Sequence, residues 1–371
     1  MVRPAAILLI AVAGLATVAA GPYTETGVNG YIDSVTWRHA DPMTATAVLN
    51  PIFRGWATGV AEYAPSDQIW SGAWNDPNKA LGPATGQNFD IVSLGELERS
   101  EIDGGVSPGY ITLVFGDPCD PNGGGIRNGR GYDFAVFENA FISWGTWPDK
   151  GIFQGQMIAE LAYVEVSSNG RDFARFPSVS LTPNPAKAYG TIEIGNVHNL
   201  AGKHPNASGQ CMGTPFDLEE LAGHPDVTSG AVDLNDIRFV RILDIPGSGD
   251  FLDEATSQTD PATGPAWQFY TRRHPIYDAW PTWGSAGFDL EAIGVLHEQQ
   301  YSADINLDGK VDLTDLMLLA SAWHSQFGQE QWIERCDLAE PRDLFIDSSD
   351  FARFAAQWRH VERWRAQFDH E

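Results

Sequence analysis

The chain has 371 residues, of which 43% are hydrophobic, so it is long enough for two or three domains and a sizeable core. Its formal net charge of −26 argues against a nucleic-acid partner, because the phosphates would be repelled. The 38 glycines and 23 prolines indicate a globular, turn-rich and mainly β protein.

Residues 1–20 have the features of a secretory signal peptide. Arg3 supplies one positive charge, an apolar run follows that is short for a membrane span, and Ala19 and Ala20 stand before Gly21. The alternative is an uncleaved anchor. No later segment reaches ~18 consecutive apolar residues. We therefore expect a secreted or cell-surface protein that does not span the membrane once the signal is cleaved.

Residues 21–297 are predicted to form one large β domain. Apolar residues occupy both faces of several short runs between turn clusters, as in the inner strands of a sandwich. The runs with strand character are 110–115, 132–137, 161–166, 237–243 and 288–295. Asn169 and Gly170 predict a tight hairpin turn, because this pair accepts the positive φ values that such turns need.

Short motifs follow one another in a fixed order across residues 61–296. They are the segments 76–83, 109–116, 133–139, 159–170 and 287–290. This order is similar to that of a group of secreted or cell-surface bacterial proteins of undefined activity. The strand pattern also resembles discoidin and galactose-binding-like modules, which implies a jelly-roll-like β-sandwich.

A pair of carboxylates in this region offers an enzymatic alternative. Glu138 and Glu160, with Glu165 and Asp133 behind them, are candidates for the two acids that a glycosidase places roughly 5 to 10 Å apart. The alternative, which we favour, is that these side chains are acceptors that fix loops. The sequence contains no nucleophile elbow, metalloprotease motif, P-loop or dinucleotide fingerprint. We expect a non-catalytic protein, and a glycoside hydrolase or polysaccharide lyase is the alternative.

Tryptophans and an acidic loop are further candidates for binding. Exposed indoles in loops stack on sugar rings, so a polysaccharide is a candidate ligand, although burial against the loops is the alternative. The close pairs are Trp70 with Trp74, Trp144 with Trp147, and Trp280 with Trp283. The loop 117–125 gathers oxygen ligands beside glycines and is a candidate for a structural calcium. Its Cys119 and the more distant Cys211 could form a disulfide, which would leave Cys336 unpaired.

Residues 304–315 have the spacing of a calcium-binding loop. Oxygen-bearing side chains stand at positions 1, 3, 5, 9 and 12, and Gly309 stands at position 6. The predicted ligands are Asp304, Asn306, Asp308, the carbonyl of Lys310, Asp312 and Asp315. The alternative is an acidic turn without metal. We favour Ca²⁺, because four carboxylates within twelve residues repel each other unless a cation offsets them.

The same unit recurs 35 residues later. The helical pattern that starts at Asp315 is repeated from Asp350, with apolar residues at i, i+3 and i+7. Two such repeats over 303–358 resemble a type I dockerin module. The resemblance implies Ca²⁺ as cofactor and a cohesin-like protein or surface scaffold as partner.

The second loop departs from the dockerin pattern. Leu344 stands where glycine is expected, and Asp337 reaches position 1 only if two residues are inserted near Pro341. The weaker second calcium site would contain Asp337, Asp343, Asp347 and Asp350. In dockerins, positions 10 and 11 of each loop help to contact the cohesin. The matching residues here are Leu313, Thr314, Ser348 and Ser349.

The chain is therefore expected to contain a signal peptide (1–20), a β-sandwich domain (21–297), a small α-helical calcium-binding dockerin-like module (303–358) and a helical extension (359–371). The extension is predicted from apolar residues that continue past Trp358, and it would pack back onto the β domain or bind an acidic surface. The leading hypothesis is a secreted calcium-binding protein that docks to a partner. The alternatives are a dockerin-bearing enzyme that uses Glu138 and Glu160, and a repeat that acts as a calcium-dependent clamp on the β domain.

Overall fold

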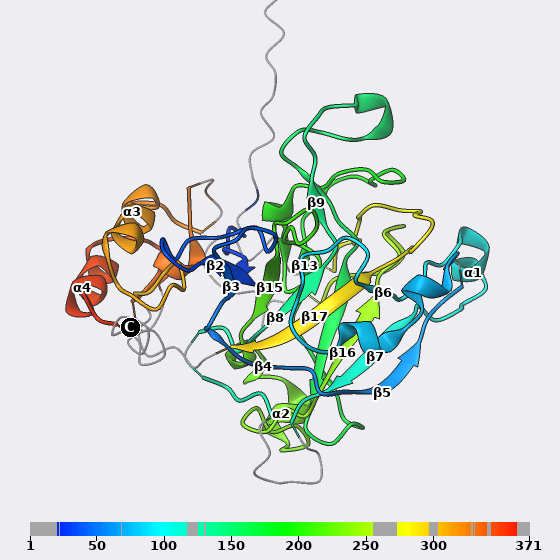
Figure 1. Ribbon diagram of the computed structural model, residues 1–371, viewed down its shortest axis with the longest axis horizontal. Coiled ribbons are helices and arrows are strands. Elements are labelled where there is room, and N and C mark those ends of the chain that lie inside the picture. Colours follow the sequence, from blue (N-terminus) through cyan, green and yellow to red (C-terminus); the bar gives the residue numbers. More distant parts are fainter. Residues whose placement is uncertain are drawn as a thin grey trace, which may run out of the picture.

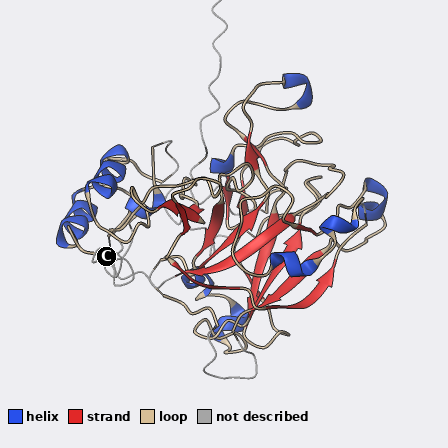
Figure 2. Ribbon diagram, in the orientation of Figure 1, coloured by secondary structure: helices blue, strands red, loops and turns tan. Residues whose placement is uncertain are grey.

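The computed structural model describes residues 21, 23–67, 69–116, 125–129, 131–254, 273–296, 303–327, 329, 331–339 and 343–361. This part of the chain is mainly β, as the sequence predicts. Two large antiparallel sheets lie next to a small helical unit that the C-terminal residues form (Figures 1 and 2). The predicted signal peptide, 1–20, lies outside the described residues.

The first sheet has six strands, in the spatial order β1, β15, β8, β17 and β4, and β6 also pairs with β17. Strands β8 and β17 are buried over almost their whole length, which agrees with the apolar residues on both of their faces. The bounds are β1 Val28–Asn29, β4 Phe53–Trp56, β6 Val92–Ser93, β8 Phe134–Glu138, β15 Met212–Phe216 and β17 Asp289–Leu296.

The second sheet has five strands, in the order β12, β11, β16, β7 and β5. The bounds are β5 Gly59–Ala64, β7 Tyr110–Val114, β11 Ala162–Ser167, β12 Ala174–Arg175 and β16 Phe239–Asp244. Between β11 and β12, Gly170 has a φ of 73°, and its N–H donates to Ser167 Oγ at 2.9 Å. The hairpin predicted from Asn169 and Gly170 is therefore confirmed.

Side chains from both sheets form one hydrophobic core. The first sheet contributes residues such as Phe134, Val136 and Ile293, and the second contributes residues such as Leu113, Val164 and Ile242. The five segments expected to have strand character overlap β7, β8, β11, β16 and β17, each to within two residues at either end. The strand positions read from the sequence are thus confirmed.

Short strands, two short helices and single turns surround the sheets. The strands are β2 Tyr31–Asp33, β3 Ala47–Leu49, β9 Phe141–Ile142, β10 Met157–Ile158, β13 Val179–Ser180 and β14 Val197–His198. The helices are α1 Arg99–Asp103 and α2 Pro225–Thr228, and the 3-10 turns are η1 Gly72–Trp74, η2 Pro77–Ala80, η3 Pro148–Lys150, η4 Ile194–Asn196, η5 Leu218–Leu221 and η7 Glu334–Cys336.

The helical unit contains two helices that begin in the same way. In each, an N-cap aspartate accepts the N–H two residues later, at 2.7 Å, and the aspartate three residues later accepts the N–H of the cap, at 2.9 or 2.7 Å. The pairs are Asp312 with Asp315 and Asp347 with Asp350. These capping boxes satisfy backbone donors that a helix start leaves without partners. The helices are α3 Leu313–Ser321 and α4 Ser348–Ala356.

The two repeats also pair with each other through the segments that flank their helices. Residues 324–327, after α3, pair with 344–346, before α4, and residues 359–361, after α4, pair with 310–311, before α3. The helix that was predicted to continue over 359–371 ends at Ala356 instead. Arg359 turns the chain with a φ of 66°, so that Val361 can pair with Lys310. Residues 362–371 lie outside the described part.

One face of the helical unit packs onto the β domain. Tyr23, at the start of the described chain, belongs to the same hydrophobic cluster as Leu319, Trp332 and Phe354. Its ring stands edge-on to Phe327, with the ring centroids 5.7 Å apart. The first residues of the β domain and the last part of the chain therefore share a core.

Two of the three cysteines lie in the described part of the chain. Cys211 and Cys336 are both free, buried thiols, so the disulfide considered between Cys119 and Cys211 is not formed, and Cys119 itself lies outside the described residues. Among the helices that the structure describes, none combines the length and the apolar character needed to cross a membrane.

Candidate functional sites

Acidic residues from both sheets meet at one end of the β domain. Glu138 ends β8 and Asp289 begins β17, and these antiparallel neighbours place Glu138 opposite Leu290. In the other sheet Asp244 ends β16, and its Oδ1 accepts the N–H of Phe288 at 2.8 Å. The fold thus brings together carboxyl groups that are far apart in the sequence.

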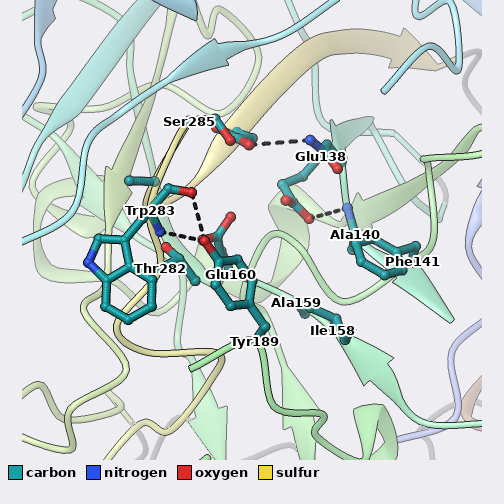
Figure 3. Close-up of a pocket in the computed structure, with 13 residues that line it drawn as sticks. Glu138, Ala140, Phe141, Ile158, Ala159, Glu160, Tyr189, Thr282, Trp283 and Ser285 are labelled. Carbon is teal, nitrogen blue, oxygen red and sulfur yellow. Dashed lines mark hydrogen bonds between the residues drawn. The ribbon is translucent and has the colours of Figure 1, made fainter. Parts of the chain in front are cut away.

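The predicted pair Glu138 and Glu160 lines a single pocket, and Asp289 lines it with them (Figure 3). Its volume is about 100 Å³. The other lining residues are Asn139, Ala140, Phe141, Ile158, Ala159, Tyr189, Thr282, Trp283, Ser285 and Ala286. The two glutamates come from different sheets, since Glu160 lies just before β11.

Each glutamate has a raised pKa because the pocket removes it from water. Glu138 is 2% exposed, and its Oε2 accepts the N–H of Ala140 at 2.8 Å. Burial raises its pKa well above the usual range, and the nearby charge of Asp289 adds to the shift. Burial, followed by the charges of Asp289 and Glu138, likewise raises the pKa of Glu160, while a hydrogen bond with Thr282 opposes the rise.

Asp289 is the third acid of the pocket, and the sequence did not single it out as a site residue. It is 2% exposed, and burial raises its pKa to about 7, although the nearby hydroxyl groups of Ser285 and Ser93 oppose the rise. Its Oδ2 accepts from Asn139 Nδ2 at 3.2 Å. Its Oδ1 has no hydrogen-bond partner among the described residues. The nearby hydroxyl of Ser93 donates to the carbonyls of Ser285 and Ala286.

Three more acids lie behind the pocket. Burial raises the pKa of Glu96 and of Asp278 well above the usual range and that of Asp244 to about 8, and the acids reinforce one another. In the part of the chain that the structure describes, no lysine or arginine forms an ion pair with any of the six acids. The only sign of these acids in the sequence was a single acidic residue at the end of an apolar run, as at Asp244.

Aromatic side chains stand beside the acids. The hydroxyl of Tyr189 donates to the carbonyl of Trp283 at 2.7 Å and accepts its N–H at 2.8 Å, as Figure 3 shows. Trp283 is 43% exposed, and Tyr189 and Phe141 are similarly exposed. These three rings therefore combine a position in the pocket wall with access to solvent.

The tryptophan pairs predicted from the sequence have different environments. Trp144 is 81% exposed and meets Trp147 edge-on, with the ring centroids 4.9 Å apart. Trp70 is also exposed, whereas Trp74 and Trp280 are half-buried. The indole N–H of Trp280 donates to the carbonyl of Leu97 at 3.2 Å, which is a structural contact.

Asp133 and Glu165, the two acids predicted to support Glu138 and Glu160, fix local structure. Asp133 accepts the N–H groups of Gly129 and Leu218, each at 2.8 Å. Glu165 forms an ion pair with Arg175 at 2.7 Å. Neither lines the pocket. Most of the candidate calcium loop 117–125 lies outside the described residues.

The predicted calcium loop 304–315 is folded around its own carboxylates. Asp304 is fully buried and accepts the N–H groups of Asp308 and Gly309, at 3.1 and 2.8 Å. Asp315, also buried, accepts the N–H groups of Ile305 and Asn306, at 2.8 and 3.0 Å. Gly309 has a φ of 81°, as a sharp turn at position 6 requires. Burial raises the pKa of Asp315 to about 6.

The second loop repeats this arrangement in spite of its different sequence. Asp350 accepts the N–H groups of Leu338 and Ala339, at 2.6 and 2.9 Å, as Asp315 does in the first loop. Asp337 accepts the N–H of Leu344 at 3.1 Å, which matches the bond from Gly309 to Asp304. Asp337 thus takes the place of position 1 with two extra residues in the loop. Leu344 has a φ of 61°. Of the predicted ligands, Asp343 is exposed and Asp347 is half-buried.

All four residues predicted to contact a partner are exposed: Leu313, Thr314, Ser348 and Ser349. Apolar side chains extend this surface along both helices. They are Met317, Trp323, Phe351 and Trp358. Trp323 and Phe351 meet edge-on, with the ring centroids 6.3 Å apart, so the exposed faces of α3 and α4 are continuous.

The described residues contain no group of three or more histidine, cysteine, aspartate or glutamate side chains that is arranged to hold a metal ion. In comparisons with known proteins, no family model, no curated protein and no solved structure matches the chain.

Proposed function

We propose that this is a secreted or cell-surface bacterial calcium-binding protein, in which a jelly-roll-like β-sandwich acts as a recognition module and a dockerin-like module docks to a cohesin-like protein or surface scaffold. The observation that carries this proposal is the shape of the helical unit. Its loop 304–315 encloses Asp304 and Asp315, whereas the residues expected to contact a partner face solvent.

The donors of the first loop suit Ca²⁺. Asp304, Asn306, Asp308, the carbonyl of Lys310, Asp312 and Asp315 supply only oxygen atoms, which hard cations prefer. A bound ion would neutralise the four carboxylates that this short loop holds together. Because Asp312 and Asp315 also form the capping box of α3, calcium binding and the start of this helix depend on the same side chains.

The exposed face of α3 and α4 supports docking over the clamp alternative. A clamp would cover the contact residues with the β domain, but Leu313 is 62% and Met317 is 65% exposed. The opposite face, which includes Leu319 and Trp332, is the one that packs against Tyr23. The helical unit is therefore fixed to the β domain by one face and free to bind with the other.

Binding suits the acidic pocket better than glycoside hydrolysis. A glycosidase needs one carboxyl group that is protonated and one that is ionised. Here burial shifts the pKa of Glu138 and of Glu160 in the same direction, upward, whereas a glycosidase holds the pKa values of its two acids apart. A polysaccharide remains a candidate ligand of the recognition module, and the exposure of Trp144 supports it.

Calorimetry with Ca²⁺ on the mature chain tests the proposal. We expect one binding event with a dissociation constant on the order of 10⁻⁷ to 10⁻⁵ M, and its loss in Asp304→Ala. Asp149→Ala, at an exposed position outside both loops, is the matched control and should bind as the wild type does. The absence of heat in the wild type, or equal heat in Asp304→Ala, would contradict the calcium assignment.

Docking is tested with an immobilised type I cohesin domain. The wild type should bind in Ca²⁺ and dissociate in a chelator. Met317→Glu should weaken binding about ten-fold or more, because it places a charge on the exposed apolar face. Lys187→Glu, at an exposed site on the β domain, should have no effect. Binding that survives Met317→Glu would exclude this face as the contact surface.

A further inference from the structure

Three carboxyl groups line the pocket and supply hydrogen-bond acceptors. Glu138, Glu160 and Asp289 reach it from three segments of the chain, and Asp289 Oδ1 has no partner among the described residues. A buried carboxylate without a partner costs free energy, because it has lost its hydration and gained nothing in return. The pocket is therefore suited to a ligand that carries hydrogen-bond donors and positive charge.

A neutral sugar fits this pocket less well. Each sugar hydroxyl is both a donor and an acceptor, whereas an ammonium group has three donors and no acceptor. An ammonium group thus matches a pocket that is lined by three carboxyl groups.

The walls of the pocket suit the apolar part of an organic cation. Tyr189, Trp283 and Phe141 line it and are partly exposed, so they can contact both a ligand and solvent. Aromatic faces attract ammonium groups and bury alkyl chains. The volume of about 100 Å³ admits several water-sized groups but not a polymer chain.

We propose that the pocket binds the head group of a small primary alkylammonium ion, with the unpartnered Oδ1 of Asp289 as its main acceptor, Glu138 and Glu160 as further acceptors, and Tyr189 and Trp283 against its alkyl part. This assignment deepens the proposed role of the β domain as a recognition module. It does not depend on calcium or on docking.

Binding of a cation is coupled to proton release in this pocket. Burial raises the pKa values of Glu138, Glu160 and Asp289, so a bound ammonium ion would displace protons from them. The other titratable groups that act on them are Glu96, Asp244 and Asp278, which are also acids with raised pKa values. Affinity for the cation should therefore increase from pH 6 to pH 8.

The test is calorimetry of the mature chain with propylammonium chloride at pH 8, with propan-1-ol, glucose and CaCl₂ as competing probes. We expect heat from propylammonium, none from propan-1-ol, and proton release when buffers of different ionisation enthalpy are compared. Asp289→Asn should weaken binding about ten-fold or more. The exposed Asp149→Asn is the matched control and should not.

Two further variants keep the test decisive. If Asp289→Asn does not fold, Trp283→Ala, at a partly exposed position, should still weaken propylammonium binding by several-fold. Asp304→Ala should leave it unchanged, which separates this proposal from the calcium assignment. The proposal is overturned if propan-1-ol or glucose binds as tightly, if CaCl₂ competes, if Trp283→Ala has no effect, or if no heat is observed.

Discussion

Individual buried charges in this protein fall into two groups, with and without a compensating cation. Lys203 is buried, and its Nζ donates to Glu25 Oε1 and to the carbonyl of Val197, each at 2.5 Å. Burial alone would raise the pKa of Glu25, but the charge of Lys203 and the hydrogen bond from His198 hold it below its usual range. Among the described residues, the acids of the pocket, such as Asp289, form no ion pair with a lysine or an arginine.

Lys203→Met should strongly destabilise the fold. The change leaves Glu25 as a buried charge that has lost its main partner, which typically costs ~3–5 kcal/mol of unfolding free energy. Urea denaturation at pH 7 measures this cost. Lys187→Met, at an exposed position, should change the free energy by less than about 0.5 kcal/mol. A double variant, Lys203→Met with Glu25→Gln, should recover part of the loss, and a cost below about 1 kcal/mol for Lys203→Met would refute this explanation.

The sequence identified only some of the acids in the pocket. Glu138 and Glu160 were found as a pair because both follow or precede runs of strand character. Asp289 and Asp244 were not chosen as site residues, because their roles depend on which strand ends become neighbours. Pairing of β8 with β17 and contact between the sheets decide this, and neither can be read from local pattern.

At the scale of elements, the local sequence predicted where most of the strands lie and where the two helices begin. Short apolar runs between turn clusters located the strands, and the aspartates that open α3 and α4 marked both helix starts. The end of α4 was missed, because the apolar spacing continues past Trp358. Pairing of residues 359–361 with the segment before α3 overrides that spacing. Tertiary pairing, rather than helix propensity, thus sets the end of this helix.

The β11–β12 hairpin provides a test of its turn. Gly170 has a φ of 73°, and a Cβ built there would lie 3.3 Å from ring atoms of Phe239. Gly170→Ala should therefore lower the unfolding free energy by about 1–2 kcal/mol. Gly72→Ala is the control, since a Cβ there meets nothing within 4 Å and its φ is not positive. Denaturation curves of the two variants that coincide would contradict the role of this turn.

At the scale of the whole molecule, the six acids at one end of the sheets impose a pH dependence on stability. The group consists of Glu96, Glu138, Glu160, Asp244, Asp278 and Asp289, and burial raises the pKa of each. Above the ordinary pKa of a carboxyl group, the folded state then binds more protons than the unfolded state. Stability must fall as pH rises through this range.

The unfolding free energy should fall by about 2 kcal/mol or more between pH 6.5 and pH 8. Each group that is protonated only in the folded state contributes about 1.4 kcal/mol per pH unit. Asp244, with a pKa raised to about 8, stays protonated over most of this window. His198 acts in the same direction, because its pKa is also raised. Chemical denaturation at constant Ca²⁺ measures the slope of the unfolding free energy against pH. Asp244→Asn should make this slope shallower. A flat or rising profile would show that these acids are ionised in the folded protein.

The position of Tyr23 has a consequence for biosynthesis. Its ring stacks on His198, with the ring centroids 4.7 Å apart, and it shares a cluster with Phe327 and Trp332. Phe327 and Trp332 are translated about three hundred residues after Tyr23, so its ring cannot reach its final environment until most of the chain has been synthesised. A protease that removed residues 303–361 would therefore uncover the face of Tyr23 that packs in this cluster.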